Sequence, residues 1–186
     1  VDLVVDPDDK KRVLYQMGAV LERELKDVAK AIETYQRVLE LDPSDLTALG
    51  RLDVLYQASS NWTELLGILQ RESELSSDPN ATISFQYRIA ELYETHLDDV
   101  PRAIDLYRDV LNAEPSHQPT LRRLEALKDA QKETGDEALA ASAVLEPIYE
   151  GSGDWQRLIS VLEVQVKYAE DPLSKVDLLH RIARLY

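Results

Sequence analysis

Apolar residues recur along this chain at spacings of one, three and four, which places them on one face of an α-helix. From Asp8 to Leu25 the apolar face is formed by Val13, Leu14, Met17, Val20, Leu21 and Leu25. A second helix is predicted over 29–41, with Asp27 as its cap and an inner stripe of Ala31, Ile32, Tyr35, Val38 and Leu39. The two helices together predict one antiparallel pair.

The same pattern predicts further helices over 46–57, 62–75, 80–97, 100–113, 120–131 and 137–150, and others up to Tyr186. Asn61 is expected to cap the helix over 62–75, and Pro101 lies in the first turn of the helix over 100–113, where a missing N–H costs little. Pro147 should kink its helix or mark a late start.

The helices repeat. The segment 31–43, AIETYQRVLELDP, returns without a gap 72 positions later as AIDLYRDVLNAEP at 103–115. An acidic residue precedes each of four prolines spaced by 36, at positions 7, 43, 79 and 115, but the next such proline, Pro172, follows after 57. The sequence therefore predicts a repeat array with a helix-sized insertion of 21 residues in its fourth interval.

We predict a single array with repeats at about 8–43, 44–79 and 80–115, an irregular part at 116–136, a repeat at 137–172 and a partial one at 173–186. Residues 1–5 are expected to be the tail of an earlier helix, so the array is expected to be a fragment of a longer one. The predicted fold class is all-α: a right-handed α-solenoid of stacked antiparallel helix pairs.

The chain is acidic, with 35 Asp and Glu against 21 Lys and Arg and a net charge of −14. Nucleic-acid binding is not expected, because Lys and Arg supply most of its affinity. The charge favours a basic protein partner or serves solubility alone. The 44% hydrophobic content with few glycines is typical of an ordered helical protein.

The absence of cysteine excludes disulfides, thiolate metal sites and a cysteine nucleophile. No run of residues is apolar enough for a membrane span, and the N-terminal residues do not resemble a signal peptide. We therefore expect a cytoplasmic protein, although a signal sequence further upstream stays open.

These repeats resemble the tetratricopeptide repeat family, whose unit of about 34 residues is a helix, a turn and a helix. Matching pairs of residues lie at the family's small, large and aromatic positions and at its closing proline: Gly18 and Ala90, Leu21 and Tyr93, Ala31 and Ala103, Tyr35 and Tyr107, Pro43 and Pro115. The resemblance implies a helical scaffold that binds other proteins.

The chain departs from the family pattern in its spacing of 36, in Asp53 and in four leucines of the even repeats, Leu65, Leu69, Leu158 and Leu162. The family's best-known groove holds a terminal carboxylate with Lys and Asn side chains. Two of those places are occupied here by Tyr15 and Ala19, and Gly50 or Arg51 lies near a third. Binding of chaperone tails by that mechanism is not expected.

Residues with catalytic potential are scattered. His96, His117 and His180 lie in different repeats, so no metal site or cofactor is predicted. The acidic pairs at 8–9 and 98–99 adjoin helix starts, where the helix dipole favours negative charge. Trp62 and Trp155 occupy equivalent positions, which favours packing over ligand stacking. We predict no enzymatic activity.

In the family, the first helix of each repeat lines the inner, concave surface. That geometry implies a partner-binding groove of Arg12, Tyr15, Glu22, Gln57, Tyr87, Glu91, Glu94, Arg122, His180 and Arg184. Tyr15, Tyr87 and His180 lie at equivalent positions and are expected to grip a peptide with polar rings, or simply to cover the next helix.

Three functions follow as hypotheses. The first is a non-catalytic scaffold that binds a partner segment, preferably a basic one, on the concave face. The second is a structural module that self-associates by stacking through its terminal helices. The third is a regulatory region of a larger multidomain protein.

Overall fold

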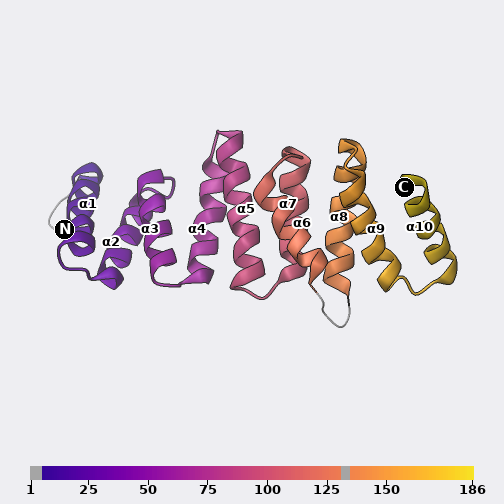
Figure 1. Cartoon of the computed structure of the whole chain (residues 1–186). Helices are drawn as coiled ribbons and strands as arrows, with labels where there is room; N and C mark the ends of the chain where they lie inside the picture. The colour runs from indigo at the N-terminus through magenta and orange to yellow at the C-terminus, as the bar shows by residue number, and fades with distance from the viewer. Residues whose placement is uncertain (1–5, 131–134) are drawn as a thin grey trace. The chain divides into compact units, whose positions relative to one another are not determined.

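The computed structural model describes residues 6–130 and 135–186, which form ten α-helices and no strand (Figure 1). The helices are α1 (Pro7–Arg23), α2 (Val28–Leu41), α3 (Leu46–Ala58), α4 (Trp62–Leu75), α5 (Pro79–Thr95), α6 (Val100–Ala113), α7 (Gln118–Asp129), α8 (Asp136–Ser152), α9 (Trp155–Tyr168) and α10 (Pro172–Leu185). The all-α class is confirmed. The predicted helix tail at 1–5 and residues 132–134 of the predicted connection lie outside the described residues.

Helix starts follow the predicted capping chemistry. Asp27, Asp45, Asp99 and Asp154 each accept a hydrogen bond from the backbone N–H three residues later, at the N-termini of α2, α3, α6 and α9. A carboxylate at this position satisfies a backbone donor that has no partner inside the helix. These aspartates explain why most predicted helix bounds agree with the structure to within two residues.

Two local predictions are wrong. The first helix ends at Arg23, so Leu25 lies beyond it, and both Val20 and Leu25 are exposed. Asn61 lies at the N-cap of α4, but its side chain makes no capping hydrogen bond. For Pro147 the late helix start is excluded, since α8 begins at Asp136 and continues past Pro147, and the alternative of a kink stays a prediction.

The chain divides into two compact units, Val1–Leu92 and Tyr93–Tyr186, with the boundary inside α5. In the first unit α1 packs on α2, α2 on α3 and α3 on α4. Close helix contact requires a small residue at Gly18, where an added Cβ would lie 2.7 Å from the ring of Tyr35. The resemblance placed a small residue and an aromatic at these two positions.

In the second unit α8 has more than one role. It packs on α6, α7 and α9, and α9 packs on α10. Three helices, α7, α8 and α9, lie between Pro115 and Pro172, whereas each earlier interval between the spaced prolines holds two. Gly135 precedes α8 with φ 71°, and an added Cβ there would lie 2.3 Å from the ring of Tyr168. The division into repeats stays a prediction.

Candidate partner-binding surface

Four ion pairs, which we call the ion-pair ladder, join helices that the repeat pattern predicts to be first helices. They connect α1 with α3, α3 with α5, α5 with α7, and α8 with α10. The closest N–O distances are 3.7 Å for Glu22–Arg51, 2.6 Å for Asp53–Arg88, 3.5 Å for Glu94–Arg123 and 2.6 Å for Glu146–Arg181. Each pair lies within one of the two units.

The ladder follows the sequence repeats. Glu22–Arg51 returns as Glu94–Arg123 with both residues 72 positions later. A tyrosine from the second helix fixes each of these glutamates: the Tyr35 hydroxyl donates to Glu22 at 3.2 Å, and the Tyr107 hydroxyl to Glu94 at 2.6 Å. Burial and the negative charge of Glu22 raise the pKa of Tyr35, so this tyrosine stays a hydrogen-bond donor.

All ten residues predicted for the groove lie on helices that contribute to the ladder, and none is buried. Arg12, Gln57, Arg122, His180 and Arg184 are exposed, and Tyr15, Glu22, Tyr87, Glu91 and Glu94 are half-buried. The structure brings Glu22, Gln57 and Glu94 into contact with ladder arginines. Arg12 pairs instead with Asp9 of its own helix, at 2.7 Å. Whether these residues bind a partner stays a prediction.

The hydroxyl of Tyr15 is engaged within the protein. It donates to Asp45, the residue that caps α3, and Lys11 lies 2.5 Å from the same carboxylate. Burial, followed by the hydrogen bond to Asp45, raises the pKa of Tyr15. Tyr15 therefore joins α1 to the start of α3, and its half-buried ring is the part available to a partner.

Sequence analysis missed the arginines of the ladder and the acids Asp53 and Glu146. The signal was present, because Asp53 and Arg88 return 93 positions later as Glu146 and Arg181. A charge pair that recurs at a repeat offset predicts a contact only when it is known which helices stack on each other. Asp53 was noted only as a departure from the family's small residue.

The α3–α5 pair contains a buried third charge. Both guanidinium nitrogens of Arg88 donate to Asp53, at 2.7 and 2.6 Å. Glu72 of α4 is only 8% exposed, and its Oε2 has no hydrogen-bond partner among the described residues. Burial, reinforced by the charge of Asp53, raises the pKa of Glu72 to about 7. We call Asp53, Glu72 and Arg88 the first cluster.

The α8–α10 pair has the same arrangement with an amide in place of the third carboxylate. Gln165 of α9 donates to Glu146 at 2.6 Å, and Arg181 donates to the other oxygen of Glu146 at 2.6 Å. Burial opposes ionisation of Glu146, but these two hydrogen bonds outweigh it and lower the pKa of this carboxyl. We call Glu146, Gln165 and Arg181 the second cluster.

A cavity of about 660 Å³ lies between the start of α7, the end of α8 and the first turn of α9. In the first unit, Leu49 and Tyr56 are both buried on α3. Their sequence equivalents, Leu121 and Tyr149, lie on two helices, α7 and α8, and both line the cavity. The cavity thus lies where two residue positions that share α3 in the first unit are divided between α7 and α8.

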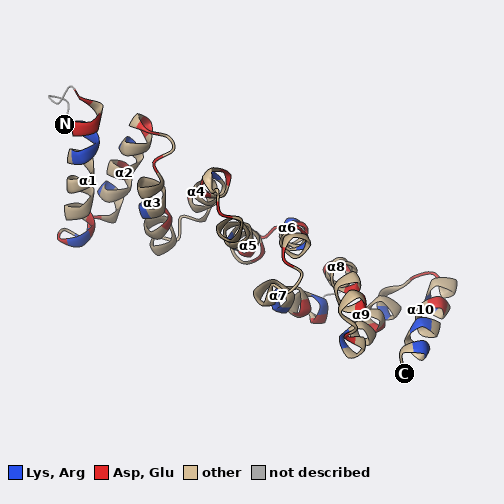
Figure 2. Cartoon of the chain, turned by 90° about the horizontal axis from the view of Figure 1, so that it is seen from above, with Lys and Arg blue, Asp and Glu red and all other residues tan. Residues whose placement is uncertain are grey.

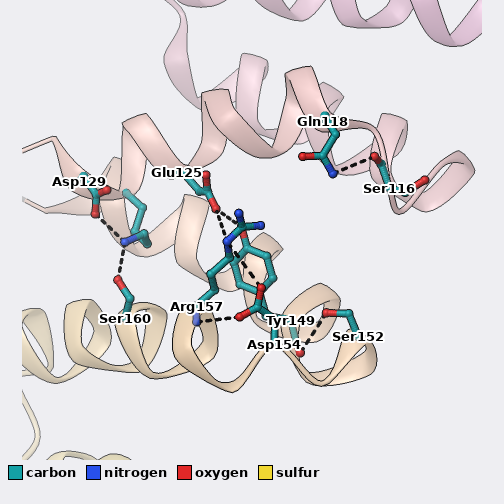
Figure 3. Close-up of polar contacts among 10 residues, drawn as sticks. Ser116, Gln118, Glu125, Asp129, Tyr149, Ser152, Asp154, Arg157 and Ser160 are labelled. Atoms are coloured by element: carbon teal, nitrogen blue, oxygen red, sulfur yellow. Dashed lines mark hydrogen bonds and ion pairs between the residues drawn. The ribbon is translucent and has the colours of Figure 1, made fainter.

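Polar side chains at this cavity satisfy one another (Figure 3). The Tyr149 hydroxyl donates to Glu125, and Arg157 lies 3.5 Å from Glu125 and 3.6 Å from Asp154. Arg157 also lies over the Tyr149 ring, 5.6 Å from its centroid. These pairings place Arg157 against two carboxylates.

Next to them, Lys128 is almost fully buried. Its ammonium donates to Asp129 at 2.5 Å and to the hydroxyl of Ser160 at 2.8 Å, which joins α7 to α9 (Figure 3). A buried ammonium needs such partners, because desolvation without them is costly. Lys128 therefore has a structural role.

The tryptophan positions differ from the prediction in part. Trp62 is half-buried, but Trp155 is 49% exposed at the first residue of α9, so packing between repeats is wrong for Trp155. His117 lies at the N-cap of α7 with its Nδ1 2.8 Å from the Thr120 hydroxyl.

Charge along the helices is mixed. Figure 2 shows acidic and basic residues interspersed on α1 and α10. Among residues 6–130 and 135–186, no group of three His, Asp or Glu is arranged to hold a metal ion. No helix in the described part of the chain is both long and apolar enough to cross a membrane. The cytoplasmic location and the preference for a basic partner stay predictions.

Comparison with protein families matches two segments of the chain, residues 12–45 and 85–117, to a model described as "Tetratricopeptide repeat". The resemblance seen in the sequence is confirmed for these segments, which contain most of α1 with α2 and most of α5 with α6. Comparison with curated proteins gives no match.

Among solved structures, the chain is similar to YrrB, described as "a TPR protein with an unusual peptide-binding site". The two are 15% identical, with a TM-score of 0.47, and the similarity covers 92% of this chain and 84% of the other.

Proposed function

Because the chain carries tetratricopeptide repeats at residues 12–45 and 85–117, we propose that it is a non-catalytic scaffold that binds a segment of a protein partner. Repeat arrays of this kind present extended surfaces for recognition and do not build a single reactive centre. The proposed binding surface lies on the first helices, beside the ion-pair ladder.

The ladder is the observation that supports this choice of surface. It fixes α1, α3 and α5 by ion pairs in the first unit, and it leaves Gln57, Tyr87 and Glu91 at least partly exposed beside Arg88. Rigid helices that present partly exposed aromatic and charged side chains suit a peptide in extended or helical form, because little side-chain freedom is lost on binding.

The proposed partner segment is basic. The support is the net charge of −14 on the whole chain, since the three glutamates among the ten groove residues are balanced there by Arg12, Arg122 and Arg184. Opposite charge raises the rate of association and makes binding weaken as salt is added. A peptide selected for tight binding should therefore contain Lys or Arg.

The test begins with a random peptide library displayed on phage and selected on the whole chain. Selected peptides are then measured against a Tyr15, Tyr87 and His180 triple alanine variant. We expect at least a tenfold loss of affinity with unchanged helicity by circular dichroism. The matched control is Trp155→Ala, which removes an exposed aromatic from the second-helix position of α9 and should leave binding intact. Unchanged binding by the triple variant would contradict the groove assignment.

The second candidate function is self-association, and α10 carries the observation that favours it. Leu173, Val176 and Leu179 are exposed on this helix at spacings of three, and Tyr186 is 89% exposed beyond it. Such an apolar stripe is typical of a helix that packs on another. Sedimentation of the wild type and of a Leu173→Glu, Leu179→Glu variant tests it: a monomer across 1–100 μM, roughly the range in which weak dimers form, would exclude stacking.

A further inference from the structure

Glu72 is an acidic residue that lies almost fully buried. It belongs to α4 and is 8% exposed, and its Oε2 makes no hydrogen bond among the described residues. An ionised carboxylate buried in this way costs free energy unless it is paired, whereas its protonated form is neutral and carries a donor of its own. The surroundings of Glu72 therefore decide its charge.

Those surroundings contain too few cations for the carboxylates. On α3, Asp53 raises the pKa of Glu72 by its negative charge, and on α5, Arg88 opposes that effect by its positive charge. Arg88 already donates to both oxygens of Asp53 and, at 3.5 Å, to the Gln57 amide oxygen, and Glu91 lies near Arg88 as a further negative charge. One guanidinium thus serves Asp53 fully while Glu72 receives no hydrogen bond from it.

The second cluster shows the neutral form of the same arrangement. Gln165, which replaces Glu72 at the equivalent position, donates an amide hydrogen to the carboxylate that Arg181 also binds. A protonated Glu72 has the same capacity to donate, but an ionised Glu72 does not. The second cluster holds its arginine pair without a titrating third group.

We propose that Glu72 is a proton-controlled switch of the α3–α5 contact: in its neutral form Arg88 pairs with Asp53, and in its ionised form Glu72 competes with Asp53 for Arg88. Competition draws the guanidinium toward α4, which weakens the link from α3 to α5. If Glu72 moved toward water instead, Arg88 would stay on Asp53 and the switch would fail. Burial and the charge of Asp53, which raise the pKa of Glu72 to about 7, set the change near neutral pH.

The switch regulates partner binding if the proposed function holds, since Gln57, Tyr87 and Glu91 are among the predicted groove residues of α3 and α5. A binding segment that requires these helices to be fixed together would then bind more tightly below pH 7 than above it. This consequence rests on the proposed function, whereas the switch itself does not.

The first experiment needs neither a variant nor a partner. The ¹³C shift of the Glu72 carboxyl and the ¹⁵Nε shift of Arg88 are followed by NMR on the whole chain from pH 4 to 9, with assignment by comparison with Glu72→Gln. We expect a Glu72 midpoint near 7, far above the ordinary 4.5, and a change at Arg88 with the same midpoint. A Glu72 midpoint below 5.5, or an Arg88 signal that does not follow it, would overturn the switch.

The second experiment measures stability by urea unfolding from pH 5 to 8. Because the pKa of Glu72 is higher in the folded than in the unfolded chain, its contribution to stability is present below about 4.5 and lost as pH rises through about 7. Relative to Glu72→Gln, the urea midpoint of the wild type should therefore fall across this range. Parallel curves for the two proteins would contradict the proposal.

Peptide binding and the titration of Glu72 together separate the switch from the binding hypothesis. If the selected peptides fail to bind but Glu72 titrates together with Arg88, the switch stands and the proposed function fails. If peptides bind equally at pH 6 and pH 8 while Glu72 titrates, the switch exists but does not regulate that surface.

Discussion

The first and second clusters use the same three positions to solve one problem in two ways. Each joins two first helices through a carboxylate and an arginine and places a side chain from the intervening second helix against them. In the first cluster that side chain is Glu72, whose Oε2 is unsatisfied, and in the second it is Gln165, which donates a hydrogen bond.

Burial and charge are balanced differently in the two clusters. The Asp53 side chain is 13% exposed and that of Glu146 is 21% exposed, so the first cluster is drier although it contains one more carboxyl group. The second cluster is satisfied at any pH at which Glu146 is ionised. The proposed pH dependence of the first cluster therefore rests on a carboxyl oxygen of Glu72 standing where Gln165 has an amide nitrogen.

The largest effect is expected from removing the arginines. Arg88→Ala leaves Asp53 and Glu72 without their cation and should cost about 3 kcal/mol of stability at pH 8. Arg181→Ala should cost about 1 kcal/mol, because Arg181 is more exposed and Gln165 still donates to Glu146. Urea unfolding of both variants checks the ranking. Equal losses would show that Glu72 adds nothing to the dependence on Arg88.

An intermediate effect is expected from giving the second cluster the first cluster's charge. Gln165→Glu replaces a donor with a second carboxyl group beside Glu146 and should cost about 1 kcal/mol at pH 8. The loss should shrink as pH falls toward 5, because the new carboxyl becomes protonated. Unfolding curves at pH 5, 6, 7 and 8 measure this trend, and a loss that is independent of pH would argue against the equivalence of the two clusters.

The smallest effect is expected at Gly50, which lies in α3 beside Glu72, whereas the equivalent position in α8 is Ala143. A Cβ added to Gly50 would meet only the Glu72 carboxyl, at an ordinary 3.7 Å. Gly50→Ala should therefore raise stability by about 0.5 kcal/mol through helix propensity. Thermal unfolding checks it, and a loss of stability would show that Glu72 needs the space above the glycine.

Much of the fold was predictable because local chemistry determines it. The aspartate caps, the acidic residue before each of the prolines spaced by 36 and the stripe around Tyr35 set the helix bounds without knowledge of the stacking. Their failures have local causes too: Leu25 fitted the helical spacing, but α1 ends at Arg23, before the chain reaches Leu25.

The clusters were not predictable to the same degree. Glu72 follows Leu65, Ile68 and Leu69 at the spacing of the buried stripe of α4, but a charged residue is typical of solvated positions, and only the packing of α3 and α4 shows that it is buried. The predicted groove residues were chosen by analogy with the first helices of the family. Their placement on those helices follows from the repeat register, but their use in binding does not.

The several contacts of α8 have a consequence for how the second unit unfolds. In a simple repeat array each repeat touches only its neighbours, so terminal repeats fray one at a time. Because α8 packs on α6, α7 and α9, its loss removes three interfaces together. Amide hydrogen exchange in α7, α8 and α9 should therefore report one shared opening free energy, in contrast to the graded protection expected from α1 to α4.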